Sequence, residues 1–235
     1  MPVLTLRVSP PSHTLREVQW ALLADVPEEQ LRLLLSIARR RRFSRGEVVF
    51  HRDDPGDSLH LIAAGYFAIK VTTPIGNTVT LALRGPGENF GEMALVSGDT
   101  RRSATVEALE PAETFSVYQT DFERLRHEHP AVDRVLIALL AQEVRAINDR
   151  LLEALYVSSD RRVLRRLVEL AARYPADDAP QVLPLTQEEL AMWAGASRGT
   201  ANRVLREEQE RGTIELRRGR TIVLDLEALR RRARG

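Results

Sequence analysis

The sequence contains no cysteine and a single lysine, Lys70, so arginine carries almost all of its positive charge. The absence of cysteine excludes disulfides, iron–sulfur clusters and thiolate-bound metals. No apolar run reaches the roughly 18 residues that a membrane span requires, because Arg32 interrupts the densest one at residues 31–38. The first twelve residues lack the basic start and apolar stretch of a secretory signal. We therefore expect a cytoplasmic protein with no membrane partner.

The sequence motifs of common enzymes are also missing. There is no phosphate-binding GK[ST] loop, no nucleophile elbow and no metal-binding histidine pattern, and the His-Glu-His at residues 127–129 is expected on the surface. Asp53, Asp54 and Asp57 lack EF-hand spacing and favour a Pro-Gly turn over a calcium site. A haem or redox sensor is not expected either, since cysteine and a suitable axial histidine are absent. The sequence predicts no enzyme and no metal.

Composition places the chain among soluble globular proteins, with 43% hydrophobic and 29% charged residues over 235 positions. That length is enough for one large or two ordinary domains. The net charge of +1 is unevenly divided, because residues 161–235 hold 16 arginines against 11 acidic residues, a net charge of +5. A basic C-terminal part on a nearly neutral chain favours a polyanionic partner, although a solvated basic surface would give the same composition.

A long helix is predicted from about residue 131 to 156, because apolar residues recur there with alternating spacings of three and four. This seam comprises Ile137, Leu140, Val144, Ile147, Leu151 and Ala154. A second apolar stripe covers a neighbouring face of the first turns and comprises Val132, Val135, Leu136 and Leu139. One helix with two apolar faces must bury both, which favours one face on its own domain and the other on a second copy. A core helix of a single domain is the alternative.

Before this helix, from Arg42 to about Tyr118, the apolar period changes to two and turn signals recur every 8–12 residues. Six to eight short strands with this pattern predict a small antiparallel sandwich or barrel. The expected inward residues include Val48, Phe50, Leu59, Leu61, Ala63, Phe67, Ile69, Val71, Val79, Leu81, Leu83, Val106, Ala108, Phe115 and Val117. The fold class is therefore α+β.

After the long helix, the polar residues 157–160 predict a hinge, and an amphipathic helix follows. Residues 175–184 are expected to form a loop. Thr186 with Glu189 has the pattern of a capping box that opens a helix, Gly195 lies in a short turn, and Ser197 caps a second helix from Arg198 to about Arg211. Two strands with a basic tip come next. This order predicts a winged helix-turn-helix.

One insertion interrupts the strand rhythm with the sequence FGEMALVSGDTRRSA, residues 90–104. It resembles the phosphate-binding cassette of cyclic-nucleotide-binding domains, and LTQEELAMWAGASRGTANRVL is similar to the DNA-binding motif of the cyclic-AMP receptor (CRP/FNR) family of bacterial transcription regulators. The resemblance covers roughly residues 15–232. It implies a β-roll, a double-stranded antiparallel barrel that binds a cyclic nucleotide, with a long dimerisation helix and a winged helix-turn-helix.

The residue chemistry suits a cyclic phosphate. Gly91 permits close backbone approach, Arg102 can bind the phosphodiester as a fork, Ser103 adds a hydroxyl donor, and Glu92 can accept from a ribose hydroxyl. By resemblance, the ligand-binding set is Gly91, Glu92, Met93, Ala94, Arg102, Ser103, Ile147 and Asn148. Family members that answer to cAMP usually have Thr where this chain has Ile147, so cAMP is expected while cGMP, another small effector, or no ligand at all stay open.

The second helix of the motif would enter the major groove of DNA. Residues Arg198, Gly199, Asn202 and Arg203 are expected to face the bases, and both arginines can bind guanine as a fork. The residues expected to contact phosphates are Thr186, Ser197, Thr200, Arg217, Arg218 and Arg220. Relatives commonly have Glu in place of Gly199, so the usual operator of the family should not be assumed.

The resemblance implies a homodimer that binds a palindromic operator in double-stranded DNA and meets RNA polymerase. The expected domains are a sensor at residues 15–130, a dimerisation helix at 131–157, a hinge at 158–160 and a DNA-binding domain at 161–235. A cyclic nucleotide would be the effector, with no prosthetic group. A constitutive DNA binder of the same fold is the alternative.

Overall fold

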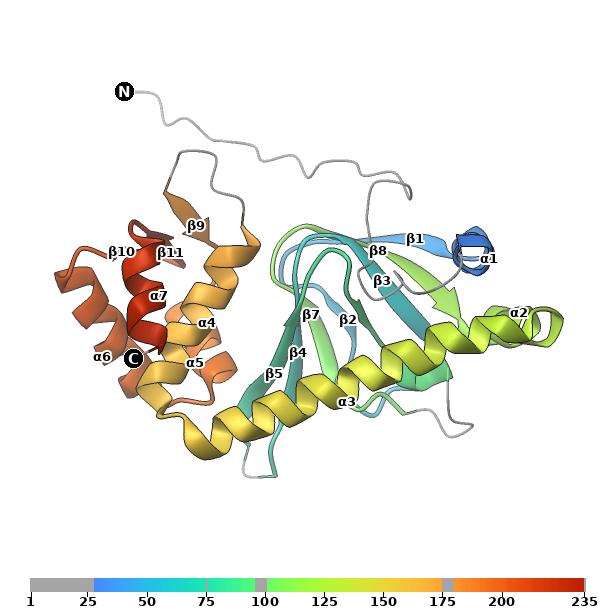
Figure 1. Ribbon diagram of the computed structural model, residues 1–235, viewed down its shortest axis with the longest axis horizontal. Helices are drawn as coiled ribbons and strands as arrows, with labels where there is room; N and C mark the ends of the chain where they lie inside the picture. Colours follow the sequence, from blue (N-terminus) through green and yellow to red (C-terminus); the bar gives the residue numbers. More distant parts are fainter. Residues whose placement is uncertain (1–27, 75, 96–100, 175–179, 235) are drawn as a thin grey trace, which may run out of the picture. The chain divides into compact units, whose positions relative to one another are not determined.

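The computed structural model describes residues 28–74, 76–95, 101–174 and 180–234. Its contacts define two compact units (Figure 1). The first ends at Ala68 and resumes over Arg84–Gln142, and the second comprises Ile69–Leu83 and the chain from Glu143 onward. Residues 15–27 of the predicted sensor domain, 96–100 of the insertion and 175–179 of the predicted loop lie outside the described residues.

Two four-stranded sheets hold the strands between residues 39 and 118, with the orders β1-β8-β3-β6 and β2-β7-β4-β5. The strands are β1 (Arg39–Phe43), β2 (Val48–Phe50), β3 (Ser58–Ala64), β4 (Phe67–Thr72), β5 (Thr78–Arg84), β6 (Asn89–Phe90), β7 (Thr105–Ala108) and β8 (Ala112–Tyr118). The pairs β1–β8, β3–β8, β3–β6 and β2–β7 are antiparallel, as the strand pattern predicted.

Strand β3 is buried along its whole length, so both of its faces lie in the interior. Leu59, Leu61 and Ala63 join a core formed with the helices, while Ser58 and His60 alternate with them and point to the opposite face. The prediction for β5 was wrong at its centre. Leu81 is 46% exposed, and its neighbours Thr80 and Ala82 are buried instead, because successive side chains of a strand point to opposite faces and the face that carries Leu81 is turned to solvent at that position.

Strand β1 was not predicted, since four consecutive arginines precede its only buried residue, Phe43. Two of its arginines form ion pairs with a glutamate on the neighbouring strand β8. Arg40 donates two hydrogen bonds of 2.6 Å to the Glu113 carboxylate on β8, and Arg42 donates a third at 3.3 Å. Cross-strand ion pairs of this kind can take the place of an apolar alternation on an exposed face.

Helices pack on the face of the first sheet that carries Leu59, Leu61 and Ala63 of β3 and Phe115 and Val117 of β8. They are α1 (Glu28–Ser36), α2 (Gln119–Glu128), the 3₁₀ turn η3 (Pro130–Val132) and the start of α3 (Asp133–Tyr156). Val132 and Leu136 from the predicted second stripe lie in this core with Leu34, Phe122 and Leu125. Nothing is described of the side chains of Val135 and Leu139, the other members of that stripe.

Helix α3 is continuous over 24 residues, close to the predicted range. Its predicted seam stays largely exposed in the single chain. Ile137 is 65% exposed, Val144 58% and Ile147 53%, whereas Leu140 packs partly against the core. Because so much contiguous apolar surface is unusual on a helix in water, the seam is a surface that another element must cover.

The second unit has the predicted order of a winged helix-turn-helix. Its elements are α4 (Ser159–Arg173), β9 (Gln181–Leu183), α5 (Gln187–Ala194), α6 (Arg198–Glu210), β10 (Ile214–Arg217), β11 (Arg220–Val223) and α7 (Leu226–Arg234). The capping box is confirmed, since Thr186 Oγ1 accepts from the Glu189 amide and the Glu189 carboxylate accepts from the Thr186 amide. Gly195 closes α5 in the left-handed conformation at φ 58°, which other residues rarely adopt.

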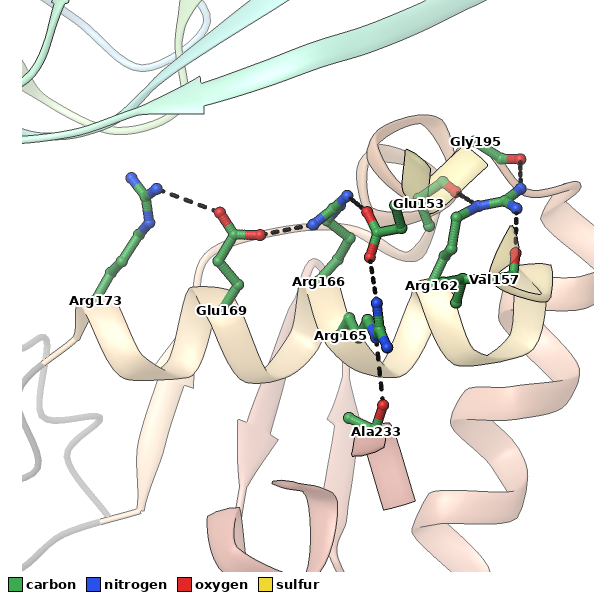
Figure 2. A network of polar contacts seen from close by, with 10 residues as sticks. Glu153, Val157, Arg162, Arg165, Arg166, Glu169, Arg173, Gly195 and Ala233 are labelled. Carbon is green, nitrogen blue, oxygen red and sulfur yellow. Dashed lines mark hydrogen bonds and ion pairs between the residues drawn. The ribbon is translucent and has the colours of Figure 1, made fainter. Parts of the chain in front are cut away.

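The break between α3 and α4 is shorter than the predicted hinge, because Ser159 and Asp160 already belong to α4 and Ser158 is its N-cap. Polar contacts cross this break (Figure 2). Glu153 near the end of α3 pairs with Arg166 and, at 3.4 Å, with Arg165. Arg162 donates to the carbonyl of Val157 at 2.7 Å, and to those of Ala194 at 2.9 Å and Gly195 at 2.8 Å. The junction between α3 and α4 is therefore held by ion pairs of Glu153 before the break and by hydrogen bonds of Arg162 after it.

Two glycines with positive φ allow a matched test of the β-roll. An alanine Cβ at Gly65 (φ +74°) would lie 2.6–2.7 Å from atoms of Ala112 and the Pro111 carbonyl, whereas Gly46 (φ +78°) has open space around it. Gly46→Ala is expected to lose about 1 kcal/mol of unfolding free energy from backbone strain. Gly65→Ala is expected to lose at least about 1 kcal/mol more, because backbone atoms must move. Urea unfolding measures both, and equal losses would contradict the packing described at Gly65.

Candidate functional site

Arg102 is a buried cation of the first unit. Its side chain is 5% exposed, and its guanidinium lies 3.9 Å from the centre of the Phe50 ring. Its Nη1 donates to the Ser58 carbonyl at 2.7 Å, and its Nη2 donates to Ser58 Oγ at 3.0 Å and Asp57 Oδ1 at 3.2 Å. Nε is buried without a partner among the described residues. Burial lowers the pKa of Arg102, and the carboxylates of Asp57, Asp54 and Glu92 oppose that shift.

Gly91 lies directly against this guanidinium. A Cβ at Gly91 would be 2.8 Å from Arg102 Nη1 and 2.8 Å from the Ser58 carbonyl, and its φ of +83° is one that glycine adopts readily. The short 3₁₀ turn η2 (Glu92–Leu95) begins at the next residue, and Leu95 fixes it in the core. A backbone turn and a buried cation therefore meet at one point, which is the arrangement that a phosphate requires.

His60 lies on β3, on the same face as Ser58, and it was not predicted from the sequence as part of the site. The His60 ring stacks on Phe90 at 4.9 Å, and its Nδ1 lies 3.0 Å from Thr114 Oγ1. Burial, with the nearby charge of Arg102, lowers the pKa of His60 to about 3, so the ring is neutral at ordinary pH. Its place in the alternation of SLHLIAA, next to Ser58 on one face, was the available signal.

The remaining predicted ligand residues are more open than their proposed roles suggested. Glu92 is half-buried and accepts from the Asn89 amide at 3.3 Å, Met93 is 48% exposed, and Ser103 is exposed. Ala94 belongs to η2, and nothing is described of its side chain. The structure thus brings together Gly91 and Arg102. Ser58 and Asp57 are hydrogen-bond partners of Arg102 that the sequence did not reveal, and His60 lies beside them with its Nε2 3.4 Å from Ser58 Oγ.

Ile147 and Asn148 lie side by side in sequence on α3, and both are exposed. Ile147 belongs to the apolar seam, as predicted, and offers no hydrogen-bonding atom. Asn148 has an amide that can donate and accept.

The recognition helix of the second unit is α6. The Ser197 hydroxyl accepts from the Thr200 amide at 3.0 Å and lies 2.9 Å from the Thr200 hydroxyl. Arg198 and Gly199 are exposed. Asn202 is half-buried, and its buried Oδ1 has no hydrogen-bond partner within the described ranges.

Arg203 on the same helix is exposed but already engaged, at 2.6 Å with Asp160 and at 2.8 Å with Glu207. Hydrogen bonds that Arg203 donates to these two carboxylates raise the pKa of Arg203 above its ordinary value. The residues expected to read bases are thus not equivalent in the structure.

The wing is the β10–β11 hairpin, in which Arg217 pairs with Arg220 across the strands. The Arg217 guanidinium donates to Glu215 at 2.7 Å, and this contact lowers the pKa of the Glu215 carboxyl. Arg218 and Arg220 are exposed at the tip. The Thr186 oxygen is used by the capping box, so only its hydroxyl proton is left for a phosphate.

Comparison with known proteins matches both units. A cyclic nucleotide-binding domain model matches residues 40–129, and a Crp-like helix-turn-helix domain model matches residues 161–232. These matched domains are those of a DNA-binding regulator rather than an enzyme. No helix in the described ranges is long and apolar enough to cross a membrane. No cluster of three or more potential metal ligands occurs in the same part of the chain.

Several full-length relatives are similar. The CRP-like cAMP-activated global transcriptional regulator of Mycobacterium tuberculosis is 32% identical over 198 residues, which cover 82% of this chain and 87% of that protein. A cyclic AMP receptor protein of Thermus thermophilus is 34% identical over 188 residues, with coverage of 80% and 85%. A solved CRP/FNR family regulator, also from Thermus thermophilus, is 25% identical with a TM-score of 0.71, covering 84% of this chain and 99% of that one. The chain belongs to the CRP family of cyclic nucleotide-responsive transcription regulators.

The buried histidine predicts a pH dependence of stability. Below its ordinary pKa of 6.5, His60 binds a proton in the unfolded chain but stays neutral in the folded chain down to about pH 3. The unfolded state therefore binds more protons in this window, and the unfolding free energy falls as pH falls, by up to about 1.4 kcal/mol per pH unit. His60→Gln should flatten this slope between pH 6.5 and 5, and His127→Gln on the exposed end of α2 should not. Urea unfolding across this range would contradict the assignment if wild type and His60→Gln gave the same slope.

Proposed function

We propose that this protein is a homodimeric transcription regulator whose affinity for DNA is set by a cyclic nucleotide, with cAMP as the leading effector. The observation that carries the proposal is the Arg102 guanidinium, which is buried against Gly91 and whose Nε has no partner in the described part of the chain. The names of the relatives from Mycobacterium tuberculosis and Thermus thermophilus, which specify cAMP, support the choice of nucleotide. The protein would act in the cytoplasm, where DNA and RNA polymerase, its further expected partner, are found.

In this proposal Arg102 neutralises the cyclic phosphate and the amides of the turn after Gly91 approach its oxygens. Ser103 and Glu92 supply a hydroxyl donor and a carboxylate acceptor for phosphate and ribose, and Met93 and Ala94 line the turn. Asn148 would read the purine edge, because Ile147 beside it cannot. Discrimination between cAMP and cGMP would then depend on the amide of a single residue.

The proposed dimer forms along the seam of α3. Four of its apolar side chains, Ile137, Val144, Ile147 and Leu151, are each more than half exposed in one chain. Their alternating spacing is that of a coiled-coil seam, so a second copy of the same helix is the simplest cover. The assembled domains would be the sensor at 15–130, the dimerisation helix at 131–157 and the DNA-binding domain at 161–235, joined by the junction that begins at Val157.

A palindromic operator follows from a two-fold dimer with two recognition helices. Arg198 and Arg203 would each bind guanine, while Thr200 and the wing arginines Arg217, Arg218 and Arg220 would contact phosphates. Ser197 and Thr186 would place helix starts near the DNA backbone. Gly199 contributes no side chain, so one base pair per half-site would be read less strictly than in relatives with Glu.

A second candidate function is favoured by the same arginine. Arg102 already has partners in its own chain, Ser58 and Asp57, so the pocket can fold with no ligand. The protein would then be a constitutive DNA-binding regulator. Isothermal titration of the purified protein with cAMP and with cGMP separates the two candidates, since the constitutive regulator would give no heat with either.

Arg102→Gln tests the pocket, with Arg101→Gln as its control. Arg101 is an exposed neighbour whose guanidinium donates to the Asp53 carbonyl at 2.9 Å. Loss of the Arg102 charge should weaken cAMP binding at least about tenfold, because a charge-assisted contact to the phosphate is lost. Arg101→Gln should stay within about twofold of wild type. Circular dichroism would verify folding of both variants, and unchanged affinity in a folded Arg102→Gln protein would show that the phosphate binds elsewhere.

Val144→Asp tests the seam, and Arg145→Asp places the same side chain on the neighbouring, exposed position of α3. A carboxylate buried without a partner at the helix pair should raise the dimer dissociation constant about 100-fold or more. Sedimentation velocity should show Val144→Asp as a monomer at concentrations where wild type and Arg145→Asp are dimers. A dimeric Val144→Asp protein would exclude the α3 seam as the interface.

A further inference from the structure

The guanidinium of Arg203 is held by two carboxylates, one on its own helix and one on another. Nη2 donates to Asp160 Oδ2 at 2.6 Å, and Nη1 donates to Glu207 Oε1 at 2.8 Å. Both terminal nitrogens are thus in use. A guanine read as a fork needs two donor nitrogens of the same guanidinium, so the two carboxylates occupy the positions that a base would take.

Arg198, the other arginine expected to read bases, differs in this respect. It is exposed at the start of α6 and makes no polar contact within the described part of the chain. Arg198 can therefore meet DNA directly, whereas Arg203 must first release its partners. The two arginines lie five residues apart on one helix, and they differ because Arg203 has carboxylate partners on α4 and on α6.

Of the two partners, Asp160 is the one that depends on the fold. Glu207 lies four residues after Arg203 on the same helix and also contacts Arg211 at 3.6 Å, so it forms an ordinary intrahelical pair. Asp160 comes from the first turn of α4, which Ser158 caps, and α4 packs on α6. A carboxylate is favoured at that helix start, which holds the Asp160 oxygens in place for Arg203.

We propose that Asp160 is a specificity-determining residue that competes with DNA for Arg203. The inference rests on the proposed function, in which Arg203 contacts a base. The Asp160 carboxylate would keep Arg203 from phosphates at arbitrary sequences, because a single phosphate contact replaces one ion pair with another. A correctly placed guanine offers two acceptors in the geometry of the fork and would displace it. Asp160 thus lowers the affinity for all DNA and restricts the action of Arg203 to matching sites.

The test is a double-mutant cycle on DNA affinity. Fluorescence anisotropy in the presence of cAMP would measure binding of wild type, Asp160→Asn, Arg203→Ala and the double variant to a palindromic fragment that the protein selects from a random pool, and to a scrambled fragment of the same length. The ratio of the two affinities should fall in Asp160→Asn, and an unchanged or higher ratio would contradict a role in specificity. Glu210→Gln is the matched control, since it removes one negative charge from α6 at an exposed position that makes no polar contact with the described residues. Urea unfolding would verify that each variant is folded.

Asp160→Asn is expected to tighten binding about two- to fivefold, the range for an exposed ion pair, and more than Glu210→Gln does. In the Arg203→Ala background the gain from Asp160→Asn should fall to the level of the charge control. Weaker or unchanged binding by Asp160→Asn, or an equal gain without Arg203, would overturn the proposal while leaving the DNA-binding function intact. If Arg203→Ala binds as wild type does, the base-reading role of Arg203 in the proposed function fails, and the competition fails with it.

Discussion

The structure of the sensor unit depends on the burial of one cation. Moving a guanidinium out of water is costly unless its donors are satisfied. The Ser58 carbonyl, the Ser58 hydroxyl and Asp57 accept from the two terminal nitrogens of Arg102, whereas Nε has no partner among the described residues. Those contacts leave no room for a side chain at position 91, so glycine there is a consequence of the buried charge. The aromatic ring of Phe50 covers the cation, and burial in the same interior keeps His60 neutral. An anion that binds here would neutralise the charge of the Arg102 guanidinium, which the fold already buries without a ligand.

An arginine paired with a carboxylate of the same chain occurs in both units. Arg102 in the sensor unit and Arg203 in the DNA-binding unit are both held by carboxylates of the same chain, Asp57 and Asp160. Each anionic partner, a cyclic phosphate or a duplex, would have to replace an internal contact. Helix α3 lies between these two arginines in the sequence and is continuous over 24 residues. Glu153 of α3 pairs with Arg165 of α4, and Arg162 of α4 donates to the carbonyl of Val157, the residue after α3 (Figure 2). A change in the pairing of α3 would therefore be passed to α4 rather than lost in a loose linker.

Periodicity and capping chemistry predicted most of the fold, because the long helix, the antiparallel strands and the capping box at Thr186 are local patterns. The failures share a cause, which is that pairing across distance overrides local pattern. Strand β1 has four arginines before Phe43, and two of them, Arg40 and Arg42, pair with the distant Glu113. The short strand β9 pairs with β11, which is also distant in sequence. In the site, the type and spacing of Gly91 and Arg102 were readable from the sequence. The contact of Arg102 with Ser58, 44 residues earlier, and the Asp160 contact of Arg203 required the folded chain.

In the proposed function, binding of a cyclic nucleotide at Arg102 controls the affinity of the protein for DNA. The most direct measurement is the dissociation constant for a selected palindromic fragment with and without saturating cAMP, at one salt concentration because phosphate contacts depend strongly on salt. DNA binding should be at least about tenfold tighter with cAMP, since a ligand can act only through a difference in affinity between two states. The same dissociation constant in both conditions would contradict it.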